Sequence, residues 1–141
     1  MSPRIDWPEL FFSANGRIGR TPFLVAAAAL TVGLALYQSV VSGSALHWVT
    51  GIVIYPLLVW CGACVLAKRL HDRGRAGWWA AVVLVAVIMV WPHPREPWDL
   101  IGLLVIVWGV VELALMPGEQ GANRFGPNPH RAAAASEGPS A

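Results

Sequence analysis

Residues 21–67, TPFLVAAAALTVGLALYQSVVSGSALHWVTGIVIYPLLVWCGACVLA, contain no Asp, Glu, Lys or Arg. A transmembrane helix needs about 20 predominantly apolar residues, so this run is long enough for two crossings. The small polar cluster Ser42, Gly43 and Ser44 divides it and suits a reversal of the chain at a membrane surface. We therefore expect a helical hairpin with spans at about 22–41 and 48–67.

The whole chain is too apolar for a soluble fold of its size. Of its 141 residues, 56% are hydrophobic and 13% are charged, and the mean hydropathy is +0.55. Both cysteines, Cys61 and Cys64, lie inside an apolar run, which argues against a secreted, disulfide-bonded fold. The composition indicates an all-α, polytopic membrane protein.

Two more spans are expected towards the C-terminus. Residues 78–91 are apolar but form only about 21 Å of helix, so the span needs either an extension back to about residue 76, which we predict, or a locally thinned bilayer. The proline-rich residues 92–97 predict a loop, because proline removes a donor and clashes with the preceding turn. A fourth span follows at about 98–116 and ends at Pro117 and Gly118. The predicted parts are a cytoplasmic lead-in (1–21), a four-helix membrane domain (22–116, with spans 22–41, 48–67, 76–91 and 98–116), a cytoplasmic motif segment (117–129) and a disordered tail (130–141).

The N-terminal part leaves alternatives open. The first span also has some features of a cleaved signal peptide, although the hydrophobic region of such a peptide is normally about 7–15 residues and this one is longer. Residues 5–12 fit either a short amphipathic piece lying in the inner interface or an irregular lead-in.

The basic residues set the predicted orientation. Nine of the ten Lys and Arg fall on one side of the spans, and Arg95 alone falls on the other. The nine are Arg4, Arg17, Arg20, Lys68, Arg69, Arg73, Arg75, Arg124 and Arg131. By the positive-inside rule this side is the cytoplasm, so both termini are predicted to be cytoplasmic.

The most polar stretch of the chain is residues 68–75, KRLHDRGR. It fits a site for an anionic group, in which arginine donates two hydrogen bonds and Asp72 orients one guanidinium. The simpler interpretation is a topogenic loop whose charges only hold the hairpin in place. Gly16-Arg17-Ile18-Gly19-Arg20 resembles Gly74-Arg75-Ala76-Gly77-Trp78, which raises the alternative of two duplicated hairpins in one orientation.

Glu112 is the acidic residue placed well inside a predicted span, about 6 Å from its cytoplasmic end. A carboxylate within a membrane is by default paired or functional. Lys68 and Arg69 are expected at the same depth and are the predicted partners. A proton or substrate role, or snorkelling to the interface, are the alternatives.

Other chemistry has little support in the sequence. A zinc site needs at least three protein ligands, and His47 and His93 are predicted on the face opposite His71. The chain has no nucleophile-elbow motif, and Cys61-Gly62-Ala63-Cys64 lies within a span rather than at the start of a thioredoxin-like helix. We predict no enzyme activity, cofactor, metal or nucleic-acid partner; His71 and Asp72 as an acid and base acting on lipid is a remote alternative.

Three separated motifs resemble a known family. They are Phe12 with Gly16-Arg17-Ile18-Gly19-Arg20 and Phe23; Arg69-Leu70-His71-Asp72 with Gly74-Arg75-Ala76-Gly77-Trp78-Trp79; and Pro117-Gly118 with Gly121, Asn123-Arg124-Phe125-Gly126 and Pro129. In this order they resemble the bacterial YhaH-like inner-membrane proteins, domain-of-unknown-function family 805, over about residues 11–129. The resemblance implies a bacterial inner-membrane protein without an assigned activity. Ala76 stands where the family is expected to have serine, which argues against an essential hydroxyl there.

These motifs converge on one predicted membrane face. The predicted polar cluster comprises Arg17, Arg20, Arg69, His71, Asp72, Arg73, Arg75, Glu112 and Arg124. Our first hypothesis is a membrane scaffold or accessory protein whose cluster contacts anionic lipid headgroups or an acidic segment of a membrane partner. The alternative is a small oligomeric transporter or channel that uses Glu112. Expected partners are membrane lipids, with a second copy of the chain or another membrane protein as further alternatives.

Overall fold

The computed structural model describes residues 6–91 and 93–129, and in these residues every regular element is a helix. The elements are α1 (Trp7–Phe12), α2 (Arg20–Val41), α3 (Ala45–Asp72), α4 (Trp79–Val90), α5 (Asp99–Gly109) and the π-helix η1 (Val110–Leu115). One isolated β-bridge joins Asn123 to Gly126. The all-α prediction is confirmed for this part of the chain, and the predicted tail at 130–141 lies outside it.

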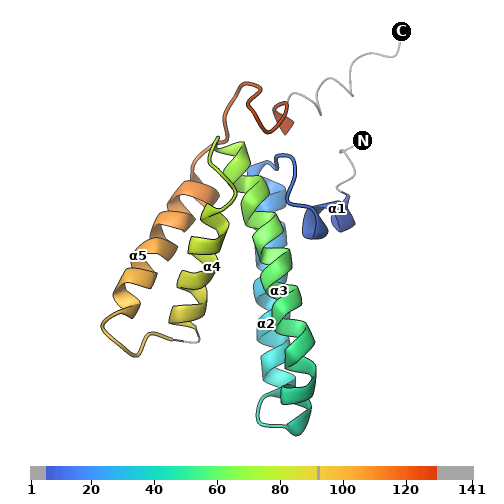
Figure 1. The fold of residues 1–141 in the computed structure, drawn as a ribbon, viewed down its shortest axis with the longest axis vertical. Coiled ribbons are helices and arrows are strands. Elements are labelled where there is room, and N and C mark those ends of the chain that lie inside the picture. Colours follow the sequence, from blue (N-terminus) through green and yellow to red (C-terminus); the bar gives the residue numbers. More distant parts are fainter. Residues whose placement is uncertain (1–5, 92, 130–141) are drawn as a thin grey trace.

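Helices α2 and α3 form a long hairpin (Figure 1). The chain reverses at residues 42–44, where Gly43 has φ +81°, a conformation that glycine adopts without strain. Their 22 and 28 residues extend about 33 and 42 Å at 1.5 Å per residue. Both helices are long and apolar enough to cross a membrane, judged by length and composition.

The second hairpin, α4 with α5 and η1, is shorter (Figure 1). α4 has 12 residues and extends about 18 Å, which is less than the roughly 30 Å of a bilayer core. The predicted extension back to residue 76 does not form, because residues 77 and 78 make a turn before the helix begins at Trp79. α5 and η1 run without a break from Asp99 to Leu115. Crossing of the membrane by this hairpin, and hence four spans in total, stays a prediction.

The N-terminal lead-in contains a real helix. The side chain of Asp6 caps α1 by accepting a hydrogen bond from the backbone N–H of Glu9, at 3.3 Å. Leu10 is buried in the core, where α1 packs against α3, whereas Trp7 and Phe12 are exposed. Of the two alternatives for residues 5–12, the helix rather than the irregular lead-in is therefore observed from Trp7 onward.

Burial is concentrated at one end of the molecule. The core there consists of Leu10, Phe23, Ala26, Val65, Ala67, Leu70, Ala80 and Leu113. Elsewhere large apolar side chains along the helices are exposed, for example Val40 at 82%, Ile52 at 77% and Leu104 at 71%. Soluble monomers rarely leave so much contiguous apolar surface uncovered, and such surface suits contact with lipid.

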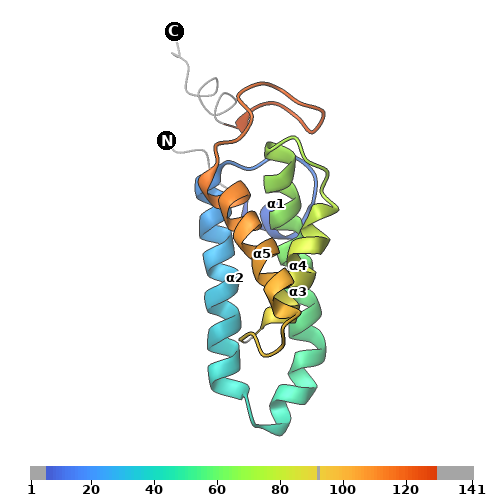
Figure 2. The ribbon, with the colours of Figure 1, turned by 90° about the vertical axis from the view of Figure 1, so that its left-hand side faces the viewer.

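The same end carries the chain segments outside the hairpins. Residues 117–129, which we call the C-terminal segment, fold over the start of α2 and the end of α3 (Figure 2). The start of α2, the end of α3 and the C-terminal segment therefore lie together at the end of the molecule that contains most of the arginines.

Candidate functional site

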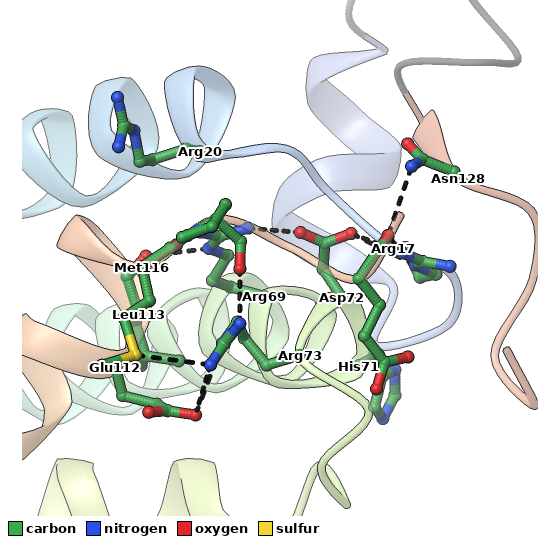
Figure 3. Close-up of polar contacts among 12 residues, drawn as sticks. Arg17, Arg20, Arg69, His71, Asp72, Arg73, Glu112, Leu113, Met116 and Asn128 are labelled. Atoms are coloured by element: carbon green, nitrogen blue, oxygen red, sulfur yellow. Dashed lines mark hydrogen bonds and ion pairs between the residues drawn. The ribbon is translucent and has the colours of Figure 1, made fainter. Parts of the chain in front are cut away.

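Arg17, in the loop between α1 and α2, connects α3 to the C-terminal segment (Figure 3). Its side chain is 1% exposed. Nε and Nη2 donate to Oδ1 of Asp72 at 3.1 and 3.0 Å, and Nη2 also donates to the carbonyl of Glu119 at 2.7 Å. Nη1 donates to the carbonyls of Gly121 and Gly126 at 2.8 and 3.1 Å. All five N–H donors of this guanidinium are thus engaged by protein acceptors.

Asp72, the last residue of α3, is the centre of the site. Its buried carboxylate accepts hydrogen bonds from Arg17 and from Arg69. Its backbone carbonyl accepts a hydrogen bond from the N–H of Glu119 at 2.9 Å. A buried carboxylate is stable only with such partners, because desolvation of the charge must be offset.

Arg69 joins Asp72 to the end of the second hairpin. Its side chain is fully buried, and Nε and Nη2 donate to the carbonyls of Leu113 and Met116 at 2.8 and 2.7 Å. The last carbonyls of a helix have no partner within the helix and form the negative end of its dipole. A guanidinium placed there satisfies both the hydrogen bonds and the charge.

Two further arginines donate hydrogen bonds to carbonyls at the C-terminal end of η1. Arg20 Nη1 donates to the carbonyl of Leu115 at 3.1 Å, and Arg73 Nη1 donates to the carbonyl of Pro117. Together with Arg69, they bind four carbonyls at this helix end, those of residues 113, 115, 116 and 117. The helix that they cap ends as a π-helix, Val110–Leu115.

Glu112 is paired, but with partners other than those predicted. Its Oε1 lies 3.2 Å from Nη2 of Arg73 and 2.9 Å from Nε of Arg75. The predicted partners Lys68 and Arg69 are wrong. Lys68 points to α1, where Nζ donates to the carbonyl of Glu9 at 2.7 Å and lies 3.6 Å from its carboxylate. Arg69 is held by Asp72, so Arg73 and Arg75, which follow the end of α3, reach Glu112 instead.

We call the set formed by these contacts the arginine cap. It comprises Arg17, Arg20, Arg69, Asp72, Arg73, Arg75 and Glu112. The structure brings these seven predicted residues together, and His71 and Arg124 lie beside them against Phe125. Their functional role stays a prediction.

His71 contacts the C-terminal segment rather than Asp72. Its ring stacks on Phe125 with centroids 3.8 Å apart, and Arg124 lies over the same phenyl ring at 4.6 Å. Nδ1 is 3.2 Å from the carbonyl of Gly16. His71 follows the predicted span, which ends at residue 67. Burial lowers the pKa of His71 below its ordinary value, the hydrogen bond to Gly16 works against this, and the positive charge of Arg124 lowers the pKa further.

This geometry gives no support to the acid and base alternative. His71 engages Gly16 and Phe125, whereas the carboxylate of Asp72 is held by two arginines. Among the described residues, no group of three or more His, Cys, Asp or Glu side chains is placed to hold a metal ion. Cys61 and Cys64 are buried free thiols.

Two glycines matter in a way that the sequence did not reveal. A Cβ at Gly118 would lie 1.9 Å from Oδ2 of Asp72, so only glycine allows the C-terminal segment to approach the carboxylate. Gly74 has φ +67°, and a Cβ there would lie 2.2 Å from Oε1 of Glu119. The sequence predicts Gly118 to be a helix stop and a member of the third motif, without a packing role. The signal that could have marked it is its place in the third motif, beside other glycines without an evident turn role.

Comparisons with known proteins agree with the motifs. Residues 11–127 match the family model described as "Protein of unknown function (DUF805)". The uncharacterized protein YiiR of Escherichia coli K12 is 32% identical over 126 residues, which covers 84% of this chain and 86% of YiiR. The protein of the same name from Escherichia coli O157:H7 matches to the same extent. No solved structure gives a significant match.

Proposed function

This chain belongs to the DUF805 family of proteins of unknown function, and we propose that it is a scaffold or accessory protein of the bacterial inner membrane. On this proposal four spans cross the bilayer and both termini are cytoplasmic. The arginine cap locks the cytoplasmic ends of the two hairpins to the C-terminal segment. The resulting rigid surface contacts anionic lipid headgroups or an acidic segment of a membrane partner.

Residence in the membrane is supported by two features of the structure. α2 and α3 have the length and composition of spanning helices, and large apolar side chains are exposed along their sides. The distribution of Lys and Arg supports the orientation, because nine of the ten lie on the side assigned to the cytoplasm.

The scaffold role is supported chiefly by Arg17, because all five N–H donors of its guanidinium are bound by other parts of the protein. Its five donors reach α3 and three carbonyls of the C-terminal segment, so a single side chain fixes these parts relative to each other. Buried arginines that are fully occupied by the protein are structural groups rather than an open anion site. The rim of the cap differs, since Arg20 is exposed, the side chain of Arg75 is 41% exposed, and Arg124 beside the cap is also exposed. The rim is the part available to lipid or to a partner.

The test compares single charge removals on the two sides of the membrane. Wild type, Arg124→Gln and Arg95→Gln are purified in a mild detergent, and bound lipids and proteins are identified by mass spectrometry. We expect Arg124→Gln to lower retention of anionic lipid or of an acidic partner about fivefold, because a basic residue near an anionic surface contributes about 1 kcal/mol. Arg95→Gln removes the same charge on the opposite side and serves as the matched control. Equal retention by all three proteins would contradict the proposal.

A further inference from the structure

A groove of about 490 Å³ lies between α3 and α4. Its walls include Val59, Ala63 and Ala67 of α3 and Ala81, Leu84 and Ile88 of α4, which recur at helical spacing on the facing sides of the two helices. α4 diverges from α3 with distance from the arginine cap (Figure 1). The small side chains of the three alanines leave the space between the helices unfilled.

The groove has the depth of one membrane leaflet. Its lining on α3 runs from Val59 to His71, which is about 18 Å along the helix. One leaflet contributes about 15 Å of a 30 Å hydrocarbon core. The groove therefore extends from the level of the cap to about the middle of the bilayer. Trp60 and Ile88, which also line it, are 58% and 59% exposed, so it opens sideways towards lipid.

The volume of the groove favours a lipid hydrocarbon chain over a protein helix as its occupant. A helix of 10 Å diameter and 18 Å length has a volume of roughly 1,400 Å³, about three times that of the groove. The groove volume instead falls within the range of about 300–1,000 Å³ that is usual for small-molecule sites. A single hydrocarbon chain also matches the apolar lining.

The otherwise apolar groove has two polar side chains in its lining. Asn15 and His71 line it at the cap end. The carbonyl of Gly16 can only accept, so Nδ1 of His71 carries a proton, and Nε2 of the neutral ring is an acceptor for a hydroxyl group. Nε2 faces Gly77, itself a lining residue, with 2.9 Å between this atom and the position of a Cβ there. Arg124, exposed and close to His71 through Phe125, adds positive charge.

We propose that the α3–α4 groove binds one acyl chain of an anionic phospholipid with a hydroxylated headgroup, with the headgroup at His71 and Arg124. This inference rests on the proposed membrane residence. Phosphatidylglycerol has the required chemistry, because its phosphate complements Arg124 and its glycerol hydroxyls donate to Nε2 of His71. The site is separate from the buried arginines, whose donors the protein itself occupies.

The test uses phosphatidylglycerol with a photoreactive diazirine on one acyl chain, in vesicles that contain the full-length protein. We expect cross-links concentrated on residues 59–67 and 81–88. Ala81→Phe fills the groove and is expected to reduce labelling of these residues about tenfold. Ala29 of α2 is also exposed and does not line the groove, so Ala29→Phe is the matched control and should leave labelling unchanged. A phosphatidylcholine probe of the same chain length should label the groove several-fold less.

The outcomes separate the two proposals. Labelling spread evenly over α2, α3 and α5, or unchanged by Ala81→Phe, would overturn the groove site while leaving membrane residence intact. Disulfide cross-linking of two copies through a cysteine introduced at Ala81, in a chain whose Cys61 and Cys64 are replaced by alanine, would overturn it in favour of a dimer interface. Equal labelling by phosphatidylcholine would overturn the headgroup assignment. Extraction of the wild-type protein by alkaline carbonate would instead contradict the proposed function.

Discussion

Gly118 shows how a single residue without a side chain determines the packing of the arginine cap. Its Cα faces the carboxylate of Asp72, and a Cβ would lie 1.9 Å from Oδ2. We expect Gly118→Ala to lower the free energy of unfolding by about 2 kcal/mol or more, because the C-terminal segment must move away from the buried carboxylate. Gly121→Ala is the control, since a Cβ there has no neighbour within 4 Å. Thermal unfolding in detergent measures both, and equal melting temperatures for the two variants would argue against the close approach.

Asp72 is the residue whose charge the cap depends on most. Asp72→Asn leaves Arg17 and Arg69 buried beside a neutral group, and breaking a buried pair in this way costs about 3–5 kcal/mol. Glu96→Gln removes a carboxylate of an exposed loop residue and should change stability by less than about 0.5 kcal/mol. Chemical unfolding in detergent compares the two. A stability loss for Asp72→Asn no greater than for Glu96→Gln would show that the ion pairs contribute little.

Glu112 separates the scaffold proposal from the transport alternative. Glu112→Gln removes the carboxylate that pairs with Arg73 and Arg75, so the scaffold proposal predicts lower stability and no defect in flux. Flux of protons or ions into vesicles, measured beside thermal unfolding, gives the answer. A wild-type flux that Glu112→Gln abolishes without loss of stability would support the transport alternative.

His71 makes the cap sensitive to acid. The pKa of His71 is lowered in the folded protein, chiefly by burial, so the unfolded chain binds this proton more readily. The contribution to stability is therefore fully present above the unfolded value of about 6.5 and is lost as the pH falls from there towards the lower folded pKa. We expect faster hydrogen exchange in residues 117–129 at pH 5.5 than at pH 7.5, after correction for the intrinsic rate. His71→Gln should abolish this difference, and persistence of the difference in that variant would assign it to another group.

At the scale of secondary-structure elements, the C-terminal segment behaves as part of the cap. A chain that ends after residue 116 loses the carbonyls of Glu119, Gly121 and Gly126 that bind Arg17. We expect such a chain to show increased hydrogen exchange at the end of α3, over residues 69–75, and a lower melting temperature. A chain that ends after residue 129 keeps these contacts and is the control. Unchanged exchange in the shorter chain would mean that the segment packs on the cap without stabilising it.

Helix positions could be predicted well where apolar runs are long and uninterrupted. α2 and α3 follow from residues 21–67, because Arg20 stands at the start of α2 and the small polar residues 42–44 separate the two helices. α3 nevertheless continues beyond the apolar run to Asp72, whereas the sequence predicts the span to end at residue 67. The start of α4 could not be predicted, since Gly77 and Trp78 are compatible with a helix in isolation but form a turn after Arg75. The hydropathy pattern does not reveal that the last predicted span ends as a π-helix. Changing from an α-helix to a π-helix over Val110–Leu115 shifts the positions of the apolar side chains by less than one turn.

The members of the arginine cap could be predicted, but their pairing could not. Basic residues at the same ends of several spans had to lie near each other once the topology was set. Arg69 and Arg73 are one turn apart at the end of α3, so either could pair with Glu112. Arg73 does so because Arg69 pairs with Asp72, against which Gly118 packs. Much of the cap also consists of backbone carbonyls, which are present at every residue and leave no trace in sequence.

At the scale of the whole molecule, we propose that both hairpins enter and leave the bilayer at the arginine cap. The cap joins the end of α3, the end of η1 and the C-terminal segment at one end of the molecule (Figure 2), so the proposed topology places all three on one side of the membrane. This shared position is a stronger constraint on topology than the apolar lengths alone, because α4 is short for a full crossing.

The most direct test is cysteine labelling in intact cells. Cys61 and Cys64 are first replaced by alanine, and a single cysteine is introduced either at Ala76, beside the cap, or at Glu96, in the loop between α4 and α5. A membrane-impermeant maleimide is expected to label Glu96→Cys from the periplasm and to label Ala76→Cys only after the membrane is permeabilised. Labelling of Ala76→Cys in intact cells, or recovery of the protein in the soluble fraction, would contradict the proposed arrangement.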